Sequence, residues 1–283
     1  MFSACLKKEF IEAKRTKNFF MTLGIAAALS LMGLFTVLML AFLKDYISAD
    51  QLGEFAVFFQ SNYATSFMYF ASFMATYFII VIIIFFCGAI SQEINKKQWI
   101  LPINSGIKPS YLIGAKILST TLIVVISYIF AALINFVFTI LLFDSGGFDV
   151  LYLIKNSCFL LIFITFLTIM LVSLNAISKK RWIPVVITLI TLIVLTKLLN
   201  EIKIGGYTLV SFTPLNFYQI VMASFDEIQQ FNMTQWLSMS ISTVLISAGF
   251  IIWAVSSTKI KAEKTTNFFD KFRKKIKKVK PTV

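Results

Sequence analysis

Side chains that could carry out catalysis are scarce in this sequence of 283 residues. It contains no histidine, which excludes the helical zinc-protease motif and histidine general-base catalysis. It also lacks the Gly-rich loop with Gly-Lys-Ser/Thr that binds nucleotide phosphates. The 13 acidic residues all lie outside the long uncharged stretches, so no carboxylate pair or proton relay is expected inside a membrane. We therefore predict no enzyme activity of its own, no metal site and no directly bound cofactor.

One short segment, residues 91–111, combines apolar and basic side chains between two long apolar stretches. Pro102, Gly106 and Pro109 prevent a continuous helix across it, and a short helix before Pro102 is expected. Trp99 and Leu101 belong to its apolar surface, which lies beside lysines. Exposed apolar groups of this kind point to a binding partner, and a plain interfacial loop is the alternative.

The stretches on either side of this segment are those of a membrane protein. The chain is 58% hydrophobic with a mean hydropathy of +0.85, above the roughly 45–50% apolar content of soluble domains. Crossing about 30 Å of hydrocarbon takes about 20 residues. The predicted spans are residues 19–43, 67–90, 117–143, 156–178, 182–199 and 236–256. We predict an all-α polytopic protein in which residues 19–256 form a six-helix transmembrane domain.

The distribution of charge predicts the orientation of the chain. With both termini inside, most of the Lys and Arg residues lie in cytoplasmic segments and most acidic residues lie outside. The net charge of +13 is therefore explained by topology and by attraction to anionic lipid. We predict a bacterial inner-membrane protein that contacts the lipid bilayer and binds no nucleic acid.

Both ends of the chain have amphipathic patterns. In residues 1–18, Phe2, Leu6, Phe10 and Ala13 recur about one helical turn apart among lysines, which predicts a helix lying on the membrane. A positively flanked signal anchor is the alternative.

The tail, residues 257–283, has a similar pattern with more charge. Phe268, Phe272 and Ile276 recur at helical spacing, with Lys274 and Lys275 among the basic residues between them. We favour docking on the lipid surface; a contact with partner subunits and disorder are the alternatives.

Two further apolar segments have patterns that predict a specific structural role. Residues 200–235 are hydrophobic yet broken by Gly205, Gly206 and Pro214, which predicts an outer re-entrant or membrane-skimming element covered by protein. A stripe of aromatic and Met residues at helical spacing could line an apolar chamber, with helix packing or lipid contact as the alternative. The stripe consists of Tyr63, Phe67, Phe70, Met74 and Tyr77.

The motifs around residues 91–116 resemble those of the permease subunits of type-2 ATP-binding cassette (ABC) exporters. Glu93, the pair Ile100-Leu101, residues 102–105 and residues 114–116 follow the order and spacing of that family. Residues 212–215 also resemble its Pro-containing outer segment. The chain departs from the family pattern at residues 96–97, where lysines replace Gly-Thr, and by an inserted Ala115.

The resemblance implies an N-terminal elbow helix, a cytoplasmic coupling helix and a dimer of two permease copies, each docked on an ATPase subunit that binds ATP and Mg²⁺. The implied ATPase contact consists of Glu93, Trp99, Ile100, Leu101, Pro102 and Ile103. A role for Glu93 in pairing with a nearby lysine or orienting the end of span two is also expected. The implied cargo is an amphipathic peptide or hydrophobic compound, such as a toxin peptide, bacteriocin or antibiotic. The alternatives are the membrane subunit of a vitamin importer and a non-transporting anchor or sensor.

Overall fold

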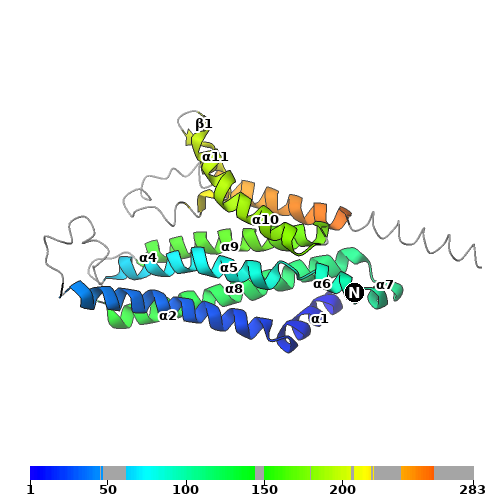
Figure 1. The fold of residues 1–283 in the computed structure, drawn as a ribbon, viewed down its shortest axis with the longest axis horizontal. Helices are drawn as coiled ribbons and strands as arrows, with labels where there is room; N and C mark the ends of the chain where they lie inside the picture. The colour runs from blue at the N-terminus through cyan, green and yellow to red at the C-terminus, as the bar shows by residue number, and fades with distance from the viewer. Residues whose placement is uncertain are drawn as a thin grey trace, which may run out of the picture.

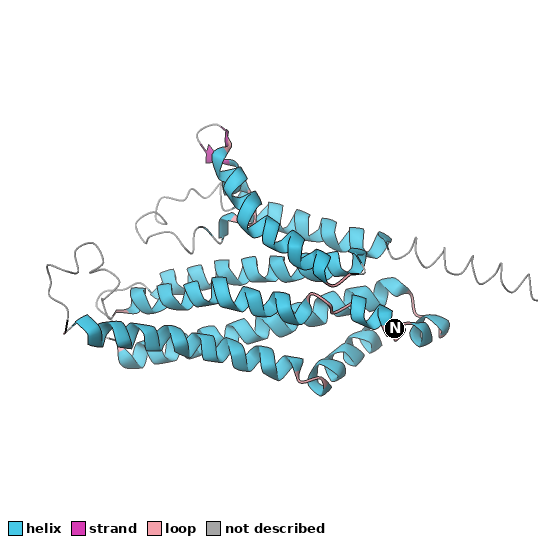
Figure 2. Cartoon of the chain, viewed as in Figure 1, coloured by secondary structure: helices cyan, strands magenta, loops and turns pink. Residues whose placement is uncertain are grey.

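The computed structural model describes residues 1–44, 46, 62–143, 150–178, 180–204, 207–217, 219 and 237–257. These residues are almost entirely helical (Figure 2). Six of their helices are long and apolar enough to cross a membrane, which confirms the predicted all-α, multi-pass architecture. The six are Asn18–Leu43, Tyr63–Asn95, Pro109–Leu142, Leu153–Ser178, Trp182–Glu201 and Leu237–Ser257.

The elements follow one another with short breaks (Figure 1). The helices are α1 (Phe2–Arg15), α2 (Asn18–Lys44), α4 (Tyr63–Phe73), α5 (Ile79–Phe86), α6 (Ser91–Asn95), α7 (Ile100–Asn104), α8 (Pro109–Leu142), α9 (Val150–Ser178), α10 (Trp182–Ile190) and α11 (Thr196–Glu201). Single π-helical segments, η2 (Met74–Phe78) and η3 (Thr191–Leu195), join α4 to α5 and α10 to α11. The two-residue strands β1 (Lys203–Ile204) and β2 (Tyr207–Thr208) pair antiparallel before the 3-10 turn η4 (Leu209–Phe212).

Helix α9 is the centre of the bundle. It packs against α4, α5 and α8 on one side and α10 on the other (Figure 1). In α9, 67% of the most apolar stretch is buried, against 11% for Trp182–Glu201 and 17% for Leu237–Ser257. The last two spans therefore present most of their apolar surface outward, as expected of helices that face lipid or another membrane subunit.

Small residues bring the first helices close together. A Cβ added to Gly33 of α2 would lie 3.2 Å from the backbone Cα and N of Phe70 in α4, so a side chain here would push the two helices apart by a few tenths of an ångström. Nearby, the Ser30 hydroxyl donates to the Ala131 carbonyl oxygen of α8 at 2.8 Å. Close backbone approach and interhelical hydrogen bonds are the forces that hold helices together in a membrane.

Helix α8 begins eight residues before the predicted span. The predicted span began only after Lys116, because a charged side chain in hydrocarbon is costly. In the structure the helix starts with Pro109 in its first turn and continues through Lys116. Lys116 is neutralised by buried carboxylates, so its charge does not interrupt the helix.

The segment after α11, predicted to be an outer re-entrant element, is partly described. Val210, Leu215 and Phe217 are buried, and the Phe217 ring lies 5.7 Å from the ring of Phe159 in α9. Residues 208–217 of this apolar segment are therefore mostly covered by protein, whereas Ile202 is exposed. Residues 205–206, 218 and 220–236 lie outside the described residues, as do the predicted tail residues Phe268, Phe272, Lys274, Lys275 and Ile276.

Candidate functional site

The N-terminus, α6, α7 and the end of the last helix at Ser257 lie at the same end of the bundle (Figure 1). Helix α7 forms the tip of this end. Its Leu101 side chain is 80% exposed, Ile100 and Ile103 are also exposed, and Pro102 is half-buried. The segment around Pro102 therefore presents apolar groups away from the body of the protein.

Trp99 and Glu93 point the other way. Both are buried, and the Trp99 indole Nε1–H donates to Glu93 Oε2 at 2.7 Å. Of the predicted contact residues, Ile100, Leu101, Pro102 and Ile103 are thus accessible to a partner, whereas Trp99 and Glu93 hold α7 onto the bundle from behind.

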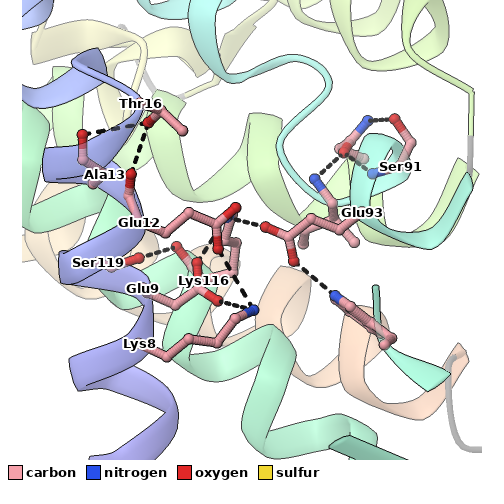
Figure 3. A network of polar contacts seen from close by, with 12 residues as sticks. Lys8, Glu9, Glu12, Ala13, Thr16, Ser91, Glu93, Lys116 and Ser119 are labelled. Carbon is pink, nitrogen blue, oxygen red and sulfur yellow. Dashed lines mark hydrogen bonds and ion pairs between the residues drawn. The ribbon is translucent and has the colours of Figure 1, made fainter. Parts of the chain in front are cut away.

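Glu93 belongs to a network that joins three elements (Figure 3). Lys116 of α8 donates to Glu93 of α6, and also to Glu9 Oε2 of α1 at 2.7 Å. This confirms the expected pairing of Glu93 with a lysine. Glu9 was not predicted as a site residue, although it lies three residues after Leu6 and four before Ala13, on the apolar face of the N-terminal helix. A charge on that face was the signal that could have identified it.

The network is close to electrically balanced. Glu9, Glu12 and Glu93 each place an oxygen within 4.8 Å of the others, a spacing that suits a cation. Lys116 supplies that positive charge, and Lys8 pairs with Glu9 at 3.3 Å and Glu12 at 3.5 Å. Burial lowers the pKa of Lys8, but Glu9, Glu93 and Glu12 outweigh it and raise the pKa above its ordinary value. Lys8 therefore keeps its charge at physiological pH.

Helix α1 is separate from α2. Thr16 ends it, and Lys17 has a left-handed φ of 61° before α2 begins at Asn18. The face of α1 that carries Cys5 and Glu9 is buried, and α1 packs against the start of α8. The N-terminal segment is thus a distinct helix, and Glu9 joins it through Lys116 to Glu93 of α6.

A second polar contact fixes the end of span two. Asn175 of α9 is fully buried, and its Oδ1 accepts from the backbone N–H groups of Ile90 and Ser91, each at 2.8 Å. Its Nδ2 donates to the Cys87 carbonyl oxygen and to Ser91 Oγ. Since the helix is broken at residues 87–90, Asn175 supplies partners for backbone groups that the helix leaves unpaired.

Replacing Asn175 with leucine is expected to lower the free energy of unfolding by about 1–3 kcal/mol, because backbone groups at the break lose a buried partner. Thermal unfolding of the purified protein measures this. Asn156→Leu is the matched control: Asn156 is buried in the same helix, and its amide has no hydrogen-bond partner among the described residues. The control should be neutral or stabilising, and equal losses in the two variants would contradict the assigned role.

The predicted aromatic stripe is divided by the π-helical segment. Tyr63, Phe67 and Phe70 line a cavity of about 270 Å³ between α4, α8 and α9. Met74 is buried, whereas Tyr77 is 51% exposed and its neighbour Phe78 is buried. The extra residue per turn in η2 rotates the later side chains, so Tyr77 leaves the face on which the first three lie.

Neither a scan against models of protein families nor a search of curated proteins gave a match to this chain.

Proposed function

We propose that the chain is the membrane-spanning permease subunit of an ATP-driven ABC exporter. The observation that carries this proposal is an exposed apolar helix, α7, held from behind by a buried network that reaches into the membrane-spanning helices. A separate ATPase subunit would bind ATP and Mg²⁺ and dock on Ile100, Leu101, Pro102 and Ile103. The chain itself would contribute no catalytic residue.

The proposal gives the buried groups a mechanical role. Movement of a docked ATPase would displace α7 and, through Trp99, the carboxylate of Glu93. Because Glu93 and Glu9 share Lys116, the displacement would reach α8 and α1 together. Asn175 of α9, which is bonded to the backbone of Ile90 and Ser91, would transmit the displacement from the end of span two to α9. Trp99 and Glu93 are in this view positioning residues behind the contact.

The rest of the proposal concerns assembly and cargo. Two permease copies, identical or different, would form the transporter in a bacterial inner membrane, with both termini in the cytoplasm and α1 as the elbow helix. The sparsely buried spans Trp182–Glu201 and Leu237–Ser257 provide apolar surface for lipid and for such a second copy. The apolar membrane-spanning surface favours amphipathic peptides or hydrophobic compounds, such as toxin peptides, bacteriocins or antibiotics, as cargo.

The test is purification of the tagged full-length chain from native membranes in mild detergent. We expect an ATPase subunit to copurify, identified by mass spectrometry, and the eluate to hydrolyse ATP. Purification of the chain alone, without ATP hydrolysis, would overturn the proposal. Tight binding of a small vitamin by the isolated chain would instead favour the importer alternative.

A further inference from the structure

A polar group in the lining of the apolar cavity between α4, α8 and α9 has no hydrogen-bond partner in the part of the chain that the structure describes. Asn135 is 5% exposed and lines the cavity, yet its Nδ2 has no hydrogen-bond partner among the described residues. Two other polar side chains of the lining, Tyr128 and Thr139, do have partners: the Tyr128 hydroxyl donates to the Ser157 carbonyl oxygen at 3.1 Å, and the Thr139 hydroxyl lies 2.7 Å from that of Ser66. A buried donor without an acceptor is costly, so an occupant of this cavity is expected to supply one.

The position of the cavity indicates which occupant. Exposed Leu133 and Ile154 belong to its lining, so it opens on the outer surface of membrane-spanning helices. Its volume of about 270 Å³ is just below the ~300 Å³ at the lower end of small-molecule sites. That space suits a single chain or ring and is too small for a folded peptide.

The depth of Asn135 adds a second constraint. It lies seven residues before Leu142, the last residue of α8, which is about 10 Å along the helix axis. The headgroup region of each leaflet is roughly 5–8 Å thick. If the helix ends at the membrane surface, Asn135 lies just inside the hydrocarbon boundary, where the ester carbonyls of glycerolipids are found.

We propose that this cavity is a lipid site that holds one acyl chain of an ester-linked glycerolipid, whose ester carbonyl accepts a hydrogen bond from Asn135 Nδ2. Tyr63, Phe67 and Phe70 form the apolar wall on α4 against which the chain packs. The hydrogen bond from Asn135 Nδ2 to the ester carbonyl stabilises the lipid in the cavity relative to the mobile lipid around the protein. This site does not depend on the proposed export function.

The test compares two photoreactive phosphatidylcholines that carry a diazirine in the acyl chain and differ only in an ester or ether linkage. Phosphatidylcholine is chosen because its zwitterionic headgroup limits attraction to the basic surface. On the full-length protein in detergent micelles, we expect the ester lipid to crosslink to the cavity residues of α8 and α9 about threefold more than the ether lipid, the size of one hydrogen bond in a membrane protein. Peptide mapping by mass spectrometry locates the crosslinks.

Two variants separate the contributions. Asn135→Leu should abolish the preference for the ester lipid, because it removes the donor while keeping the volume. Ala132→Phe should fill the cavity and lower crosslinking by both lipids, whereas Ala28→Phe, at an exposed position of α2, should leave it unchanged. Equal crosslinking by the two lipids in the wild-type protein, or crosslinks spread evenly over all spans, would overturn the proposal. The result for Asn135→Leu keeps the test valid if Ala132→Phe fails to fold.

Discussion

Replacing Lys116 with methionine is expected to lower the free energy of unfolding by about 3–5 kcal/mol, the cost of leaving a buried charge without its partner. Lys116 pairs with Glu9 and Glu93, whose side chains are only 3% and 6% exposed. Methionine keeps most of the apolar stem, so the loss reflects the missing ammonium group. Thermal or denaturant unfolding of the purified protein measures the effect.

Two further measurements make the Lys116 result specific. Lys8→Met is the control, because Lys8 is 42% exposed and its ion pairs should contribute no more than about 1 kcal/mol. Adding Glu9→Gln and Glu93→Gln to Lys116→Met should restore much of the lost stability, since no charge then remains uncompensated. A Lys116→Met protein as stable as Lys8→Met would contradict the assigned network.

On the proposed exporter function, replacing Leu101 with aspartate is expected to remove ATPase docking while leaving the chain folded. Leu101 is 80% exposed, so the substitution loses little packing within the chain. An apolar anchor at the centre of an interface commonly contributes at least about 2 kcal/mol, so ATP hydrolysis that copurifies with the chain should fall by more than about tenfold. The measurement is ATPase activity per tagged chain in the eluate.

Asn104→Asp is the matched control for Leu101→Asp. It adds the same charge to the same short helix at an exposed position but removes no apolar group. We expect it to retain most of the ATPase, and the unfolding temperature of both variants to match the wild type. Full ATPase activity with Leu101→Asp would exclude α7 as the docking site.

The sequence by itself predicted the six spans, because hydrocarbon tolerates few charges and each span appears as a long apolar run with no charged residue or, in residues 182–199, with Lys197 alone. It also predicted a short helix before Pro102, where α6 lies, and apolar groups beside it. Helix α7, in contrast, continues across Pro102, which stands in its first turn, where proline is tolerated. These features depend on residues close together in the chain. They require no knowledge of which helices touch.

Tertiary structure decided how those elements are used. The charge of Lys116 set the start of the predicted third span. In the structure, carboxylates from α1 and α6, 107 and 23 residues away in the sequence, neutralise Lys116, so α8 begins earlier and runs through it. A π-helical segment turned Tyr77 away from the stripe that its spacing predicted. Trp99 was predicted as a contact residue, yet its indole is buried against Glu93. In a membrane the position of a polar group depends on its partner, and partners that are distant in sequence become visible only in the fold.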